Sequence, residues 1–315
     1  MQDTFGRDIG YLRLSITERC TLKCAYCRAS EGLCPKAEEL SAPDIIRIVR
    51  VMADLGVTKV RLTGGEPMLR KDLEEIISGV KAVRGIRELA MTTNAQHLFG
   101  RAGKLKSLGL DRLNISLDSL KEERYRELTG GGELKRVLEG IDEALFAGLT
   151  PLKLNVVLIR GVNDDEIDDF ISLAKEKPID VRFIELMPIG NRFDADARIP
   201  TDEILSSHPY LTPLPPISEN QPAKEYTAGG FLGRVGFISP LSHKFCASCN
   251  RVRVMSDGTL RPCLGSNLEI SLKDALRNED DAALAALMQN AVLCKPKEHD
   301  LNAFVSEKNM SRIGG

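Results

Sequence analysis

The sequence predicts an α/β fold, an incomplete barrel of about six strand–helix units with a mixed C-terminal extension. Two observations support this prediction. Short apolar segments of strand type alternate with helical stretches from the start of the chain, and this alternation breaks near residue 190. Repeated β-then-α units favour a parallel sheet with helical crossovers, and six suit a partial barrel better than a complete eightfold one. We therefore expect a barrel core over residues 1–190 and an extension over 191–315 that closes it.

The core is expected to contain six strands and several helices. The predicted strands are Tyr11–Ile16, Lys59–Thr63, Glu88–Thr92, Arg112–Leu117, Leu152–Ile159 and Val181–Leu186. The predicted helices between them include Ser41–Leu55, Leu69–Val83, Glu133–Phe146 and Asp165–Ala174. The first helix has the clearest limits, because Ser41 is placed to cap its start and Gly56 follows its end.

The C-terminal extension has a different pattern. Five prolines lie between Pro209 and Pro222, which predicts an irregular connection or arm. Gly229-Gly230 and Asp257-Gly258 each lie between apolar segments and predict β-hairpins. A helical stretch from about Leu272 to Met288 follows.

Composition excludes several classes of protein. The 43 Lys and Arg residues nearly balance the 45 Asp and Glu residues, for a net charge of -2, so nothing favours binding to nucleic acid or an anionic membrane. The N-terminus lacks a signal-peptide pattern, and no apolar run approaches the roughly 20 residues that span a bilayer. We expect a soluble, cytoplasmic protein.

Six of the eight cysteines fall into two groups of three. Cys20, Cys24 and Cys27 lie near the start; Cys246, Cys249 and Cys263 lie in the last third. A closed zinc site uses four protein ligands, whereas a cubane iron–sulfur cluster held by three thiolates keeps one iron open. The pattern therefore favours two catalytic clusters.

Cys34 and Cys294 remain outside these groups. We expect them to be thiols without a role, although Cys34 could complete a zinc site with the first group.

Several predicted strands alternate aliphatic and basic residues. Arg13, Arg61 and Lys153 would then share one face of the sheet and line one cavity. Arg251 and Arg253 repeat the pattern after the second cysteine group. Buried cations need anionic partners, which local carboxylates or a phosphate-bearing ligand would supply. Taken together, the cations favour an anionic ligand.

The spacing Cys20-x3-Cys24-x2-Cys27, with Tyr26 and a preceding strand, resembles the signature of the radical S-adenosylmethionine superfamily. The loop Thr63-Gly64-Gly65-Glu66-Pro67 resembles the segment that binds the amino group of S-adenosylmethionine in that superfamily. Glycines suit close approach of a backbone to a ligand.

With Cys246-x2-Cys249-x13-Cys263 and the embedded Arg251 and Arg253, the whole chain resembles the GTP 3′,8-cyclase family of molybdenum-cofactor biosynthesis. The resemblance includes the terminal Gly314-Gly315, in that family a tail that reaches toward the active site. It implies two [4Fe-4S] clusters, held by Cys20, Cys24 and Cys27 and by Cys246, Cys249 and Cys263. It implies S-adenosylmethionine contacts at Tyr26, Gly65, Ser116 and Met187, and GTP contacts at Arg13, Arg61, Thr92, Lys153, Arg251 and Arg253, the last two also as catalytic candidates.

The reaction implied is the first step of molybdenum-cofactor biosynthesis. A 5′-deoxyadenosyl radical takes hydrogen from the 3′ carbon of GTP, and that carbon attacks carbon 8 of guanine. The product is (8S)-3′,8-cyclo-7,8-dihydroguanosine 5′-triphosphate. The resemblance also implies an external one-electron reductant and hand-off of the product to cyclic pyranopterin monophosphate synthase, and it allows a homodimer.

Two other readings stay open at this point. One is a different radical enzyme with an auxiliary cluster, such as a peptide-modifying enzyme. The other is a zinc-binding scaffold without catalysis, which iron and acid-labile sulfide analysis would distinguish.

Overall fold

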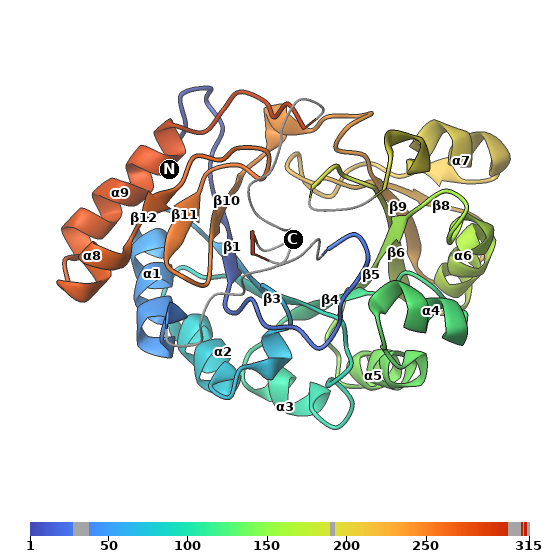
Figure 1. Ribbon diagram of the computed structural model, residues 1–315, viewed down its shortest axis with the longest axis horizontal. Helices are drawn as coiled ribbons and strands as arrows, with labels where there is room; N and C mark the ends of the chain where they lie inside the picture. The colour runs from blue at the N-terminus through green and yellow to red at the C-terminus, as the bar shows by residue number, and fades with distance from the viewer. Residues whose placement is uncertain (28–37, 190–192, 302–309, 311, 314–315) are drawn as a thin grey trace.

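The structure, a computed structural model, describes residues 1–27, 38–189, 193–301, 310 and 312–313. Its strands form one 12-stranded sheet of order β12-β11-β10-β1-β2-β3-β4-β5-β6-β9-β8-β7. All neighbouring pairs from β10 through β1–β6 to β9 are parallel. The sheet curves strongly, and helices α1 to α6 lie outside the curve (Figure 1). The chain therefore has a mixed α/β fold built on a large parallel sheet.

The strands are β1 Tyr11–Ser15, β2 Lys59–Thr63, β3 Glu88–Thr93, β4 Arg112–Ser116, β5 Leu152–Leu158, β6 Ile179–Glu185, β7 Thr212–Pro213, β8 Lys224–Thr227, β9 Arg234–Ile238, β10 Arg251–Val254, β11 Thr259–Arg261 and β12 Ile270–Ser271. The α-helices are α1 Ala42–Asp54, α2 Leu73–Ala82, α3 Ala102–Ser107, α4 Glu122–Thr129, α5 Leu134–Phe146, α6 Ile167–Glu176, α7 Thr201–Ser207, α8 Lys273–Arg277 and α9 Asp281–Leu293. All six predicted core strands are confirmed, with ends that differ by at most two residues.

Helix α1 begins where the sequence predicts. The Ser41 side chain accepts a hydrogen bond from the Asp44 backbone N–H, and the Asp44 carboxylate accepts one from the Ser41 backbone. Gly56 follows the helix with φ 99°, a left-handed conformation that favours glycine.

Two helix predictions are wrong in their limits. The predicted helix Leu69–Val83 begins later in the structure, because α2 starts only at Leu73. Leu69 instead ends a preceding 3-10 turn, Pro67–Leu69. The segment Leu272–Met288 is not one helix but two, α8 and α9. The break follows from Glu279, whose φ of 54° cannot continue a right-handed helix.

In the C-terminal part, both predicted hairpins are present. β8 and β9 are antiparallel around Gly229-Gly230, and β10 and β11 are antiparallel around Asp257-Gly258. The proline-rich stretch is irregular except for the two-residue strand β7. The sequence did not predict that β9 and β10 extend the parallel run at both of its ends.

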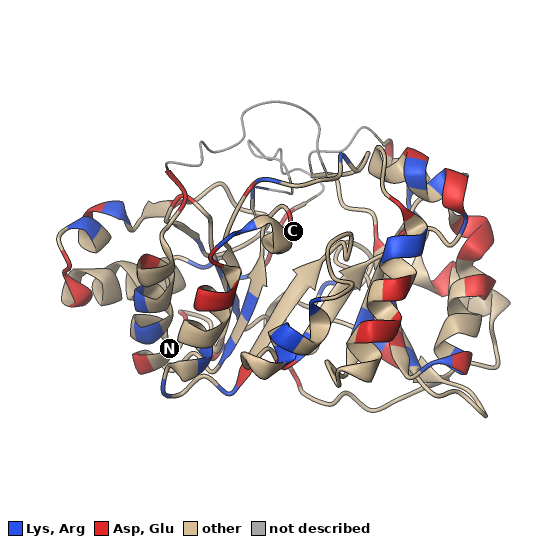
Figure 2. Cartoon of the chain, turned by 90° about the horizontal axis from the view of Figure 1, so that it is seen from below, with Lys and Arg blue, Asp and Glu red and all other residues tan. Residues whose placement is uncertain are grey.

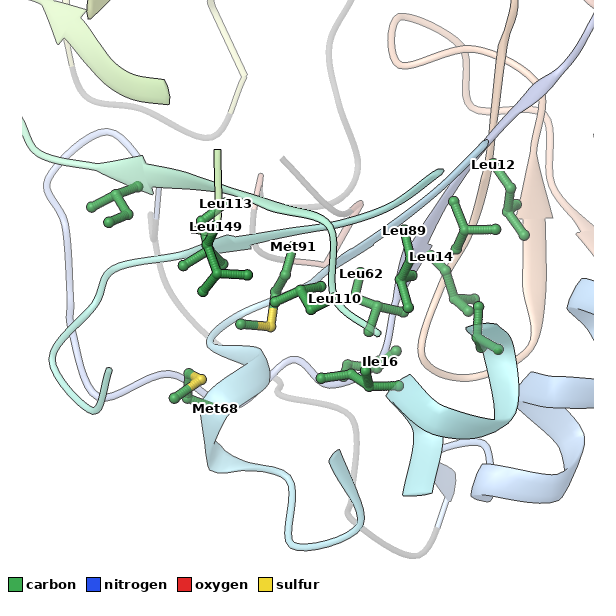
Figure 3. Packing of buried hydrophobic residues seen from close by; sticks show 14 of the residues in the cluster. Leu12, Leu14, Ile16, Leu62, Met68, Leu89, Met91, Leu110, Leu113 and Leu149 are labelled. Carbon is green, nitrogen blue, oxygen red and sulfur yellow. The ribbon is translucent and has the colours of Figure 1, made fainter. Parts of the chain in front are cut away.

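The two faces of the sheet differ in chemistry. Leu12, Leu14, Leu62, Leu89 and Met91 are buried in one apolar cluster with residues of the helices, and Figure 3 shows these side chains packed together. Lys and Arg lie at the alternate positions of the strands, visible as blue bands in Figure 2. Among the described helices, none combines the length and apolar character needed to span a bilayer.

Candidate active site

The two cysteine groups lie at opposite ends of the parallel strands, which we call the carboxyl edge and the amino edge of the sheet. Cys20, Cys24 and Cys27 follow the carboxyl end of β1, whereas Cys246 and Cys249 precede the amino end of β10, which runs parallel to β1. Cys263 follows β11, which is antiparallel to β10, and so returns to the edge where Cys249 lies. β1 is five residues long, so the two edges are roughly 17 Å apart.

The first cysteine loop is fixed by its backbone. The N–H groups of Lys23 and Ala25 donate to the carbonyls of Thr129 and Leu128 at the end of α4, at 2.8 and 3.0 Å. The Asn94 side chain, which follows β3, donates to the Cys20 sulfur at 3.6 Å. The end of helix α4 and the residue that follows β3 thus hold the loop.

The glycines after β2 allow close packing against this loop. A Cβ on Gly65 would lie 2.2 Å from the carbonyl oxygen of Arg19, directly before Cys20, and a Cβ on Gly64 would lie 2.2 Å from that of Thr17. The Gly65 N–H also donates to Thr17 at 2.7 Å. The close approach of the loop after β2 to the backbone of Thr17 and Arg19 therefore requires glycine at both positions.

Tyr26 is anchored by a buried carboxylate. Its hydroxyl donates to Asp118 at 2.7 Å, and the Val157 N–H donates to the other carboxylate oxygen at 2.8 Å. Burial raises the pKa of Asp118 to about 6 despite these two hydrogen bonds. Burial, followed by the Asp118 charge and the other two thiols, raises the pKa of Cys24 well above its usual range.

The second cysteine group lies in a more positive environment. Burial acts to raise the pKa of the Cys249 thiol, but Arg251 and Lys295 more than offset this and lower it to about 7. Cys246 and Cys263 are close enough to interact, since the charge of Cys263 contributes to a raised pKa at Cys246 after burial. Cys294 is exposed.

Two basic residues that the sequence analysis did not select hold this group in place. The Arg7 guanidinium donates to the carbonyls of Cys246, Pro296 and Lys297, and it pairs with Asp3. The Lys295 ammonium donates to the carbonyls of Arg251 and Pro262. The roles of Arg7 and Lys295 become visible only in the structure, where both side chains are buried. No sequence motif marks them.

Between the two edges lies a row of basic side chains on one face of the sheet. Register places Arg13 beside both Arg253 and Arg61. Burial, with the charge of neighbouring guanidinium groups, lowers the pKa of Arg13, Arg61 and Arg182 to about 9 and that of Arg253 to about 10. We call Arg13, Arg61, Arg182, Arg251 and Arg253 the basic row.

Some cations on this face have local partners. Lys153 lies 3.3 Å from Asp180 and 3.5 Å from Glu225, so local carboxylates supply counter-charge to this residue. Arg112 pairs with Glu88. In contrast, within the described ranges the buried Arg61 Nε and Thr92 Oγ1 have no hydrogen-bond partner. Arg61 and Thr92 therefore present unsatisfied donors to this space.

The described end of the chain connects both regions. Arg312 donates to Glu18, two residues before Cys20, at 3.1 Å, and the Arg253 guanidinium donates to the Ile313 carbonyl at 3.2 Å. Met187 packs against a small apolar cluster that includes Ile313. Gly314-Gly315 and Cys34 lie outside the described residues.

The predicted site residues occupy three kinds of position in the fold. Tyr26, Gly65, Ser116 and Met187 lie at or beyond the carboxyl ends of strands, as the first cysteine group does; Arg13, Arg61, Thr92 and Lys153 lie within strands; Arg251 and Arg253 lie in β10, which follows Cys249. Arg182, Asp118, Arg7 and Lys295 were missed. For Arg182 a signal existed, because it occupies an alternate position of its predicted strand.

Each cysteine group offers three thiols, the type of ligand that holds iron–sulfur clusters in proteins. In the part of the chain that the structure describes, no three His, Cys, Asp or Glu side chains are arranged to hold one metal ion. A separate hollow of about 600 Å³, lined in part by Arg160, Glu185 and Leu241, contains none of the predicted site residues.

Comparison with known proteins identifies the family of the chain. Residues 14–174 match the family model of the radical SAM superfamily, and residues 179–301 match that of Molybdenum Cofactor Synthesis C. Proteins named GTP 3′,8-cyclase from Alkaliphilus oremlandii and Moorella thermoacetica are 48% and 47% identical, over 100% of this chain and 100% of theirs.

Solved structures support the fold alone. SuiB of Streptococcus suis bound to S-adenosylmethionine has a TM-score of 0.60 at 17% identity, over 96% of this chain and 75% of that one. SuiB bound to its precursor peptide SuiA gives 0.60 at 16% identity, over 95% and 76%. The full-length relatives decide the more specific question: this chain belongs to the GTP 3′,8-cyclase family of radical SAM enzymes.

Proposed function

We propose that this cyclase, which acts in the first step of molybdenum-cofactor biosynthesis, works with two [4Fe-4S] clusters at opposite edges of a partial TIM-like barrel, with GTP between them. The observation that carries the proposal is the basic row, in which Arg61 and Arg182 are buried and the other three are partly buried, and which lies between two groups of three thiols. Active sites in barrels of parallel strands lie at the carboxyl ends of the strands, where the first cysteine group is found.

Cys20, Cys24 and Cys27 would hold the first cluster. When bound, the cluster and S-adenosylmethionine supply an electron and a 5′-deoxyadenosyl radical that can take hydrogen from a ribose carbon. The chain's own part is to fix the loop, through Asn94 and the end of α4, and to hold the Tyr26 ring through Asp118. Gly65, Ser116 and Met187 would complete the S-adenosylmethionine site.

Cys246, Cys249 and Cys263 would hold the second cluster, whose open iron would face the guanine. The environment supports an anionic group here, because Arg251 and Lys295 act on Cys249. Positive charge near thiols favours the thiolate form that binds metal.

The basic row would bind the GTP triphosphate, with Thr92 and Lys153. Buried and partly buried guanidinium groups that lower one another's pKa favour an anion beside them, and planar donors suit phosphate. With the guanine at the second cluster, the basic row would hold the triphosphate so that the ribose faces the carboxyl edge of the sheet. Positioning of this kind accounts for much of a rate enhancement.

The remaining parts of the proposal follow from the family. We propose a barrel core over residues 1–190 with an extension over 191–315, an external one-electron reductant, and transfer of the product to cyclic pyranopterin monophosphate synthase. A homodimer and a cytoplasmic location belong to the same proposal.

The test is an oxygen-free incubation with GTP, S-adenosylmethionine and a reductant, followed by mass analysis. We expect 5′-deoxyadenosine together with a cyclised triphosphate. Iron and acid-labile sulfide should reach about eight per chain, four for each of two cubanes, and about four in a Cys246→Ala/Cys249→Ala/Cys263→Ala variant. Stoichiometric zinc without sulfide would contradict the proposal.

A further inference from the structure

Lys295 occupies an unusual position at the end of α9. Its side chain is buried, with 3% of the residue exposed. Its ammonium donates to the Arg251 carbonyl at 2.9 Å and to the Pro262 carbonyl at 2.8 Å. Arg251 lies two residues after Cys249, and Pro262 directly precedes Cys263. One side chain therefore links the two segments that carry these cysteines.

The link lies at the open end of the β10–β11 hairpin. Register pairs Arg253 with Arg261 and Val254 with Leu260. Continued by two residues, the same register places Arg251 opposite Cys263. Lys295 thus joins the two strands at the point where the ladder ends and the cysteines begin.

The charge of Lys295 is not balanced by the described carboxylates. Both of its hydrogen-bond acceptors are neutral carbonyls, and among the described residues it forms no salt bridge with Asp or Glu. A buried ammonium without a counter-charge is strongly unfavourable. The two backbone segments that its ammonium contacts are the ones that carry Cys249 and Cys263.

We propose that Lys295 is a positioning and charge-compensating residue of the second cysteine group: it holds the hairpin segments that carry Cys249 and Cys263, and its ammonium offsets the negative charge of an iron–sulfur cluster bound there. This inference rests on the proposed second cluster. A neutral donor could supply both hydrogen bonds. The positive charge of Lys295 therefore needs a separate explanation, and an anionic group bound nearby provides it.

The charge has a measurable consequence. The reduced cluster carries one more negative charge than the oxidised cluster, so a nearby cation stabilises the reduced state and raises the reduction potential. Groups that support metal ligands from outside the coordination sphere typically contribute 10–100-fold to metal affinity. A purely structural lysine would affect folding without moving the potential.

The experiment uses the full chain with Cys20, Cys24 and Cys27 replaced by alanine, so that only the second group can bind a cluster. In this parent, Lys295→Gln keeps a donor without charge and Lys295→Arg keeps the charge. Lys81→Gln is the control, because Lys81 lies on α2 and pairs with Asp111, which directly precedes β4. After anaerobic reconstitution, retained iron is measured against increasing chelator, and the reduction potential by spectroscopic titration.

We expect Lys295→Gln to lose iron at a roughly 10-fold lower chelator concentration and to have a more negative potential. Lys295→Arg and Lys81→Gln should have potentials like the parent. Unchanged iron retention and potential in Lys295→Gln would overturn the inference and leave the second cluster intact. A parent without iron would overturn the second cluster, and the inference with it.

Folding is checked by circular dichroism of the metal-free proteins. If Lys295→Gln does not fold, Lys295→Met replaces it, because methionine keeps an unbranched apolar stem. If both fail to fold while Lys295→Arg folds, Lys295 is purely structural and the inference is wrong.

Discussion

Arg253 is the residue at which the regions of the site meet. It follows the second cysteine group, lies beside Arg13 in register, and donates to Ile313 near the chain's end. Strand alternation placed Arg253 among the cations expected to bind an anionic ligand, and the family resemblance implied its role as a GTP contact and catalytic candidate. Its link to the C-terminal segment could not be predicted, because the contact joins residues 60 positions apart.

Arg253→Ala should weaken productive GTP binding while S-adenosylmethionine cleavage continues uncoupled. A hydrogen bond between charged groups contributes about 1.5–3 kcal/mol, so KM for GTP should rise roughly 10- to 100-fold. The ratio of 5′-deoxyadenosine to cyclised product measures the uncoupling and should rise as well. Arg277→Ala on α8, an exposed position, serves as control. Unchanged cyclisation would contradict the assigned role of Arg253.

Asp118 gives a second prediction at this scale. Its pKa of about 6 lies above the ordinary value of 3.8, so the folded state favours the protonated carboxyl. Between these two pKa values, stability falls as pH rises, and at pH 7 the buried charge is fully unfavourable. Asp118→Asn should therefore stabilise the metal-free protein at pH 7, by on the order of 3 kcal/mol, with a gain that shrinks toward pH 4.

The same substitution should harm the S-adenosylmethionine site, because the amide holds the Tyr26 hydroxyl less tightly than a carboxylate does. We expect a higher KM for S-adenosylmethionine in both Asp118→Asn and Tyr26→Phe. Thermal unfolding across pH and steady-state kinetics provide the two measurements. Lower stability in Asp118→Asn at pH 7 would refute the electrostatic argument.

At the scale of elements, helix α1 was the most predictable part of the fold. Ser41 and Asp44 form a reciprocal cap, a local interaction that the sequence carries in four consecutive residues. The break between α8 and α9 was not predicted, because Glu279 adopts a positive φ and glutamate is not a residue type that favours this conformation. Local signals therefore predicted the capped start of α1, whereas a backbone conformation set by packing was not predictable.

Ser41→Ala should destabilise the protein by about 1 kcal/mol, since it leaves the Asp44 N–H without its cap. The measurement is chemical unfolding of the metal-free protein. Ser78→Ala is the control, because the Ser78 hydroxyl only bonds back to carbonyls of its own helix. Equal stability of the two variants would show that the cap contributes nothing.

For the whole molecule, the parallel sheet and its basic face were predicted from alternation, but the extent of the sheet was not. Arg182 joins the basic row through its register with β5, and β9 and β10 come from a part of the sequence without α/β alternation. Long-range pairing sets these features. The same pairing explains why Lys153 turned out to have local carboxylate partners.

The basic row should lower the free energy of unfolding of the metal-free protein. The pKa of Arg61 is lowered to about 9 in the folded state, first by burial. Because the unfolded value is higher, the charged form is disfavoured at every pH below about 9. Arg61→Met should therefore raise the melting temperature between pH 6 and 8.

Tripolyphosphate should raise the melting temperature of the parent, because an anion that binds only the folded state stabilises it by mass action. The shift should be smaller in Arg61→Met and unchanged in Arg126→Met, an exposed control on α4. Differential scanning fluorimetry measures both effects. A phosphate response that Arg61→Met keeps in full would remove Arg61 from the anion site.

The sheet order has a consequence for synthesis. β1 is the first strand made, yet its neighbour on one side is β10, whose residues emerge roughly 240 positions later. Until then, one edge of β1 presents unpaired backbone groups beside a strongly apolar surface, a condition that promotes wrong pairing between chains. A ribosome-bound or truncated chain that ends before β10 should therefore depend on chaperones far more than the finished protein does.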